Sequence, residues 1–472
     1  MDIKKENLIV LITRKKAILN NYKLVILIIF LLALFYINYA LKFNKLEIRK
    51  LYSKIRKDLN LSFINILKNK IHLGIYTYCL NNGGRARITS ILINYFYKIK
   101  IFNLYLFTKI DKQDKEYLIP EETKRVVIKN SLNNLNKIIS LNKIDILIYN
   151  LNNETEINYL NKKKTPKIIY YQHSSFFYMI YSNYSSFLSL YKEYHNSKYV
   201  VSLIPIESNY IFKYWGINSY LMKNFVTYEY NSIIPSNLMS KTILMIGRGN
   251  NKYKRFKLGI YAMEYIIIHN SMCKMKLISN VDGTYDLNYL IYNLNLENYI
   301  KFIGFSLIPE INFKNSSLHI FPSISECFPM VLCETKIYGI PNILLGLDYV
   351  QISKGGTIII YDDTPESIAK QSMKILNNEK KLKILGKEAR NSMKKFKNQI
   401  LFNKWVNLIL SIYNGDLFYN KLKSYDIEFN QSDLIKSFKK QIKLLKKRNN
   451  NFFNISIKDF INYSNLYQFK IK

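Results

Sequence analysis

The stretch Glu326-Cys-Phe-Pro-Met-Val-Leu-Cys-Glu334 places two carboxylates eight positions apart around an apolar loop. The apolar run 318–321 and a Pro-Ser turn precede it, and Gly339-Ile-Pro341 and a second apolar run, 342–345, follow it. This pattern predicts a strand, a loop, a helix and another strand, with one acid in the loop and the other about two turns into the helix. A helix N-terminus has unpaired N–H groups and the positive end of a dipole, which suits a phosphate. The two acids would then hold hydroxyl groups on either side of that phosphate.

The spacing of the two acids is not decisive alone, because the chain holds 33 acidic residues and acids are mostly solvated surface groups. Other motifs in the chain support a functional role for the two acids. A predicted strand, 71–78, runs into the glycine-rich segment Asn81-Asn-Gly-Gly-Arg-Ala-Arg87. A second apolar run, 243–248, ends in Gly-Arg and is followed by Lys254-Arg-Phe-Lys-Leu-Gly259. A third predicted strand is Tyr299-Ile-Lys-Phe-Ile-Gly304.

Together these motifs resemble those of the family-4 retaining glycosyltransferases. Glu326–Glu334 is similar to the family's E-x7-E motif, and the resemblance extends through most of residues 71–395. Within that range, Gly355-Gly-Thr357 and the apolar run after it resemble the segment that closes the second domain. Members of this family have the GT-B fold, so we expect an α/β protein with two Rossmann-like domains that face each other across a cleft. The alternation of strand and helix patterns in this range is typical of doubly wound sheets.

The resemblance implies a donor site for a nucleotide diphosphate sugar. Arg248 and Lys254 would neutralise its diphosphate, on which negative charge builds as the sugar bond breaks. Because the spacing from Arg248 is one residue longer than is usual in the family, Lys252 is an alternative to Lys254. Glu326 would contact the donor sugar, and Glu334 would hold the nucleotide ribose.

Backbone groups would complete this donor site. Gly83, Gly84 and Gly247 would let the phosphates come close to the backbone, because glycine has no Cβ. An ordinary tight turn is the alternative for the pair Gly83-Gly84. The backbone N–H groups expected beside the sugar and the phosphate are those of Phe328, Met330 and Val331.

One histidine is a further candidate. His173 closes the apolar run 168–171, and the resemblance implies that it faces the donor across the cleft as a catalytic residue; a structural role is the alternative. Asp145 precedes the apolar run 146–149 and is interpreted as the start of a strand rather than as a base. The histidines show no metal-ligand spacing and no D-x-D is suitably placed, so we expect no metal ion and no cofactor besides the donor substrate.

The length of 472 residues, 49 % of them apolar, is sufficient for two sizeable domains. We expect the acceptor domain at 71–227, a turn-rich linker, the donor domain at 241–395 and a crossover helix at 396–415. The rest is expected to form a basic tail (1–23), a transmembrane helix (24–41), a charged stalk (42–70) and a basic C-terminal extension (416–472).

The prediction of a membrane helix depends on residues 24–41, which carry no charge and reach the shortest length that crosses a bilayer. A buried core helix is the alternative. Basic residues flank both sides, and the four cysteines form no disulfide pattern, so we assign the catalytic domain to the cytosol of a single-pass membrane protein. A lipid bilayer would then be a partner, and the unidentified acceptor would be lipid-linked or membrane-bound.

The formal net charge of +37 raises the question of nucleic acid. The 70 basic residues are dispersed along the chain and no nucleic-acid-binding motif accompanies them, so we expect no specific nucleic-acid partner.

The expected reaction is transfer of a hexose to an acceptor hydroxyl with retention of anomeric configuration and without a metal ion. One alternative is a catalytically inactive GT-B protein that serves as a membrane-anchored binding partner. The presence of Arg248, Lys254, Glu326 and Glu334 together argues against it. The other is a GT-B sugar epimerase, which consumption of donor without an acceptor would separate from a transferase.

Overall fold

The computed structural model describes residues 70–415 except for short segments within that range. The predicted tail, membrane helix, stalk and C-terminal extension therefore lie outside the described residues, apart from residue 70. So do Arg248 and Lys252. The segments within 70–415 that are not described are 82, 129–131, 152–155, 157–159, 161–165, 174, 177–178, 180–183, 229, 248–252, 280–284, 305–309, 325, 346–354 and 361.

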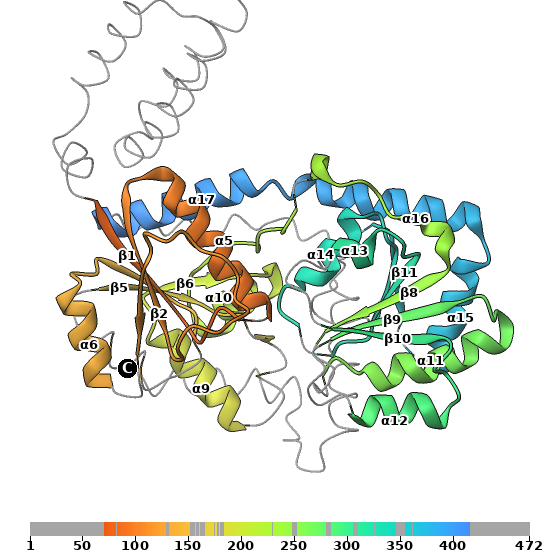
Figure 1. The fold of residues 1–472 in the computed structure, drawn as a ribbon. Helices are drawn as coiled ribbons and strands as arrows, with labels where there is room; N and C mark the ends of the chain where they lie inside the picture. The colour runs from red at the N-terminus through yellow and green to blue at the C-terminus, as the bar shows by residue number, and fades with distance from the viewer. Residues whose placement is uncertain are drawn as a thin grey trace, which may run out of the picture.

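The first half of the described chain forms a seven-stranded sheet in the order β3-β2-β1-β4-β5-β6-β7 (Figure 1). Every neighbouring pair is parallel. The central strands are continuous apolar runs because helices cover both faces of a parallel sheet. The strands are β1 (Ile71–Thr77), β2 (Phe102–Thr108), β3 (Lys124–Val127), β4 (Ile146–Tyr149), β5 (Lys167–Tyr171), β6 (Tyr199–Ser202) and β7 (Ser219–Leu221).

The second half forms a six-stranded sheet in the order β10-β9-β8-β11-β12-β13, also parallel throughout. Both sheets thus have the strand order of a Rossmann-like unit. The predicted α/β fold with two such sheets is confirmed. The strands are β8 (Thr242–Ile246), β9 (Lys274–Ser279), β10 (Ile300–Gly304), β11 (Leu318–Phe321), β12 (Asn342–Leu345) and β13 (Thr357–Ile360).

Helices accompany each sheet (Figure 1). We call the first sheet with its helices the N-terminal unit; these are α5 (Gly83–Ile99), α6 (Leu132–Leu141), α9 (Tyr184–His195) and α10 (Pro205–Trp215). We call the second sheet with its helices the C-terminal unit; these are α11 (Phe256–His269), α12 (Tyr285–Asn293), α13 (Glu310–Phe313), α14 (Met330–Ile337), α15 (Pro365–Leu376) and α16 (Glu379–Ser392). Short 3-10 turns lie at Tyr230–Ser232, Leu238–Ser240 and Met393–Lys395.

The last described helix, α17 (Asn398–Asn414), returns to the N-terminal unit and packs along α5 (Figure 1). Its Phe402 ring lies 4.9 Å from that of Tyr95 in α5. At its start, the Asn398 side chain accepts a hydrogen bond from the Val226 N–H (3.0 Å) and donates one to the Val226 carbonyl (2.8 Å). The end of the chain that follows the second sheet is therefore fixed to the segment that leaves the first.

A glycine allows the residue before β13 to pack closely against α16. Gly356 has φ +61°, and a Cβ added there would lie 2.3 Å from the Leu385 carbonyl oxygen. Both the backbone conformation and the lack of space exclude a side chain at this position.

The membrane localisation predicted from the sequence needs correction. No helix in the described part of the chain is long and apolar enough to cross a membrane. The two longest described helices, α5 and α17, have 17 residues each, fewer than the ~20 that a span requires. Segment 24–41 lies outside the described residues, and we do not retain the single-pass assignment or the cytosolic orientation that depended on it.

Candidate functional site

The strand order reverses between β1 and β4 in the first sheet and between β8 and β11 in the second. Open parallel sheets bind ligands at the carboxyl ends of the strands beside such a reversal. Gly83 follows β1, Gly247 follows β8, and Glu326 follows β11. The structure thus places the predicted glycines and the first acid of the E-x7-E motif at these two positions.

The helix N-termini at these positions face each other across the two units (Figure 1). A Cβ on Gly84, in the first turn of α5, would lie 3.6 Å from the Met330 Cγ, in the first turn of α14. Neither helix has an acidic residue in its first turn, and Pro329 makes no side-chain cap for α14. The first N–H groups of α14 therefore have no side-chain cap, and the positive ends of both helices suit an anion such as a diphosphate.

The pair Gly83-Gly84 forms the first turn of α5 and is exposed. Gly83 has φ +85°, and a Cβ there would meet no atom within 4 Å. Glycine is therefore required at position 83 because of the backbone conformation, and not because of a lack of space.

Lys254 and Glu326 form an ion pair between the Lys254 Nζ and the Glu326 Oε1. Lys254 lies in the turn before α11, and its stem passes Gly247, where an added Cβ would lie 3.1 Å from the Lys254 Cγ. The Ser323 hydroxyl also donates to the Glu326 Oε1 (2.8 Å). The structure therefore joins Lys254 to the E-x7-E segment, whereas Lys252 lies outside the described residues.

Glu334 lies one turn into α14, not two as predicted, because the helix begins only at Met330, after the extended backbone of Pro329. It is 1 % exposed. Its Oε1 accepts a hydrogen bond from the Arg87 Nη1 of α5 (2.5 Å) and another from the Thr227 hydroxyl (2.7 Å). Sequence reasoning missed both partners. Arg87 ends the glycine-rich motif and could have been found there, whereas Thr227 has no sequence signal.

His173 lies two residues beyond β5 and stacks edge-on against Tyr171, with ring centroids 4.1 Å apart. Its Nε2 is buried and has no hydrogen-bond partner among the described residues. Burial holds the pKa of His173 well below its ordinary value, and the positive charge of Arg85, in the first turn of α5, adds to this effect. The structure therefore brings a neutral imidazole close to the α5 N-terminus.

The loop before α14 joins the two units. Phe328 is buried with its ring 6.1 Å from that of Phe396, and Met330 packs in the core cluster of the N-terminal unit. Val331 is partly exposed in the first turn of α14. The side chains of Phe328 and Met330 thus anchor the loop, and the backbone N–H groups are what this segment can offer to a ligand.

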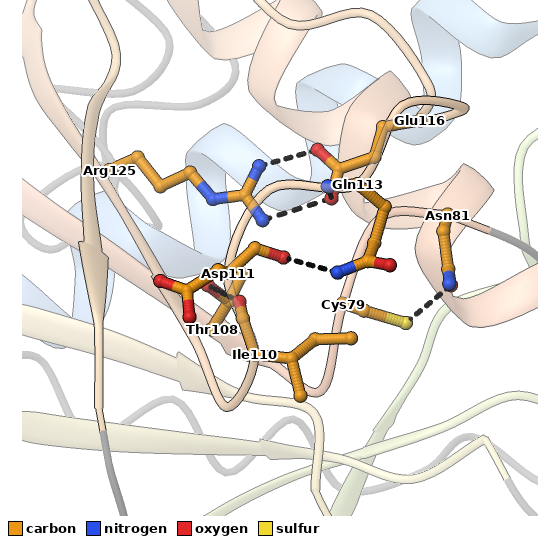
Figure 2. Close-up of polar contacts among 8 residues, drawn as sticks. All are labelled: Cys79, Asn81, Thr108, Ile110, Asp111, Gln113, Glu116 and Arg125. Atoms are coloured by element: carbon orange, nitrogen blue, oxygen red, sulfur yellow. Dashed lines mark hydrogen bonds and ion pairs between the residues drawn. The ribbon is translucent and has the colours of Figure 1, made fainter.

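The loop between β2 and β3 supports the start of α5 (Figure 2). The Arg125 guanidinium of β3 binds both carboxylate oxygens of Glu116 (2.5 and 3.0 Å). Gln113 donates to the Asp111 carbonyl (3.1 Å), and the Cys79 thiol donates to the Asn81 side-chain oxygen (2.7 Å). These contacts fix the loop beside the turn that leads from β1 into α5.

Two other sequence predictions concern groups outside this site. Asp145 accepts a hydrogen bond from the His72 backbone N–H (2.8 Å), which fits its interpretation as the start of β4. Among the described residues, no group of three or more His, Cys, Asp or Glu side chains could hold a metal ion.

Comparison with known proteins places this geometry in context. Residues 229–392 match the family described as glycosyl transferases group 1, which confirms the resemblance to glycosyltransferases. A search among curated protein sequences found no match.

Solved structures share the fold at low sequence identity. Sucrose-phosphate synthase from Thermosynechococcus elongatus is 12 % identical with a TM-score of 0.61, over 73 % of this chain and 100 % of its own. TarM, from S. aureus, is 13 % identical with a TM-score of 0.61, over 72 % and 98 %. HepE from Anabaena, in complex with UDP and glucose, is 15 % identical with a TM-score of 0.60, over 72 % and 99 %. The predicted GT-B fold is thereby confirmed.

Proposed function

We propose that this protein transfers a hexose from a nucleotide diphosphate sugar to an acceptor hydroxyl, with retention of anomeric configuration. The observation that carries the proposal is the pair of helix N-termini, α5 and α14, that face each other beside the Lys254–Glu326 ion pair. Such an arrangement suits a diphosphate with a sugar on one side and a ribose on the other. The match to group 1 glycosyltransferases and the UDP and glucose bound to HepE support this choice.

In this proposal the diphosphate lies between the two helix ends. Lys254 and Arg248 stabilise the negative charge that develops on the diphosphate as the sugar bond breaks. Glu326 orients the sugar, and Glu334 binds the ribose. The departing diphosphate takes the proton of the acceptor hydroxyl, and these two cations assist its departure in place of a metal ion.

The acceptor would reach the donor from the N-terminal unit. We propose residues 71–227 as the acceptor domain and 241–395 as the donor domain. His173 faces the donor from the acceptor side, where a neutral imidazole can exchange a hydrogen bond with a sugar hydroxyl. Approach of the two domains would exclude water and limit hydrolysis of the donor.

The test is release of nucleoside diphosphate by the full chain from a panel of UDP-, GDP- and ADP-sugars. We expect slow release from one donor in the absence of an acceptor, and a large loss of that release in Lys254→Ala and Glu326→Ala. Lys383→Met is the control, because Lys383 pairs with Glu379 within α16, where both side chains are more than half exposed. A folded protein that binds none of these donors would refute the proposal.

A further inference from the structure

Arg87 and Glu334 form an ion pair between the two units. Arg87 is in the second turn of α5, in the N-terminal unit, and Glu334 is in α14, in the C-terminal unit. The Arg87 Nη1 lies 2.5 Å from the Glu334 Oε1, and the two side chains are 12 % and 2 % exposed. A carboxylate this deeply buried is costly unless a cation and hydrogen-bond donors compensate it. The cationic partner of this buried carboxylate therefore comes from the other unit.

The contacts to Glu334 are unequal at its two oxygens. Both Arg87 and Thr227 donate to Oε1. In the described part of the chain, no donor is recorded at Oε2. A carboxylate oxygen accepts about two hydrogen bonds, so Oε2 keeps its capacity for the hydroxyls of a ligand. Arg87 and Thr227 thus fix the rotation of the carboxylate while the other oxygen stays available.

Arg87 is itself held in place. Its guanidinium carbon lies 5.6 Å from the centre of the Tyr117 ring, a cation–π distance. Tyr117 follows Glu116 in the loop of Figure 2, and its N–H donates to the Leu80 carbonyl (2.9 Å). Burial acts to lower the pKa of Arg87, but Glu334 and the neighbouring tyrosines outweigh it and raise the pKa. Arg87 therefore stays charged and oriented toward Glu334.

We propose that Arg87 is a positioning residue that orients Glu334 for the ribose hydroxyls of the donor and so couples ribose recognition to the contact between the two units. This inference rests on the proposed function, because it takes a nucleotide to be the ligand of Glu334. It assigns no contact between Arg87 and the donor. Arg87 acts through the Oε1 atom of Glu334, and the Oε2 atom of Glu334 accepts the hydrogen bonds from the ribose hydroxyls.

The test compares ligands that differ only at the ribose. Calorimetric titration of the full chain with UDP, GDP and ADP identifies the preferred nucleoside diphosphate, which is then compared with its 2′,3′-dideoxy form and with inorganic pyrophosphate. We expect Arg87→Ala to weaken the preferred nucleotide at least about tenfold, the range for a lost hydrogen bond to a charged group. The preference for ribose over dideoxyribose should nearly vanish, whereas pyrophosphate binding should change little. Arg87→Lys should keep part of the preference.

Each other outcome has a distinct meaning. If Arg87→Ala weakens ribose and dideoxyribose nucleotides equally, Arg87 acts on the phosphates or on the fold, and the inference is wrong. An unchanged affinity would overturn it as well. Thr227→Val provides an independent check if Arg87→Ala does not fold, because it removes the other donor to Oε1 and should reduce the same preference. Lys383→Met, which breaks an exposed ion pair within α16, should leave the preference intact. A wild-type protein that binds no nucleotide would instead refute the proposed function itself.

Discussion

Replacement of Glu326 with glutamine is expected to tighten the binding of a nucleoside diphosphate while it lowers sugar transfer. In the structure, Glu326 pairs with Lys254, a cation proposed to bind the diphosphate. The Glu326 carboxylate weakens the binding of the diphosphate in two ways. It pairs with Lys254, and its own negative charge repels the diphosphate. Glutamine keeps the size of the side chain and removes both effects.

The size of this gain follows from the exposure of the ion pair. The side chains of Lys254 and Glu326 are 20 % and 13 % exposed, so the pair is intermediate between two known cases. An exposed ion pair contributes about 0–1 kcal/mol, and the loss of one partner of a buried pair costs about 3–5 kcal/mol. We therefore expect about 1–2 kcal/mol, which corresponds to a Kd lower by a factor of about 5–30.

The assay is calorimetric titration of the wild-type and Glu326→Gln proteins with the nucleoside diphosphate that the wild type prefers. Glu379→Gln is the control, because Glu379 pairs with Lys383 within α16, where both side chains are more than half exposed, and its affinity for the nucleotide should equal that of the wild type. Transfer from the intact donor should fall in Glu326→Gln alone. Equal or weaker binding of the diphosphate by Glu326→Gln would show that Glu326 does not compete for the proposed diphosphate cation.

Three further predictions concern stability. Gly356→Ala should lower the free energy of unfolding in urea by more than Gly83→Ala. Both substitutions carry the cost of ~1–2 kcal/mol for a left-handed residue, but only Gly356→Ala places a Cβ 2.3 Å from a backbone oxygen. Equal losses would contradict this. Asn398→Leu should cost about 3 kcal/mol in the same assay, because it leaves the N–H and the carbonyl of Val226 without their partner, and a loss below about 1 kcal/mol would refute the role of this contact. Burial lowers the pKa of Lys336 to about 7, below its unfolded value of 10.5, so the folded state binds fewer protons between these pH values. The unfolding free energy of the wild type should therefore rise with pH between about 7 and 10 relative to Lys336→Met, and parallel pH profiles would contradict the shift.

Local sequence patterns were sufficient for the strands of the candidate site. The apolar runs Leu318–Phe321 and Asn342–Leu345 are strands β11 and β12 with unchanged bounds. Such strands are readable because a parallel strand covered on both faces must be apolar throughout its few residues. The position of Glu334 in its helix was harder to predict, since the apolar pattern does not show that α14 begins only after Pro329.

The sequence by itself determined the order of the elements, the type of fold and the segments that reach the candidate site. Only the tertiary structure decided which side chains meet there. Arg87 and Glu334 are 247 positions apart, and Lys254 and Glu326 are 72 apart. Hydrophobic periodicity reports which face of an element is buried, because burial acts on each residue separately. It does not report which charged group of another element lies opposite, since that depends on how the two sheets and their helices pack together.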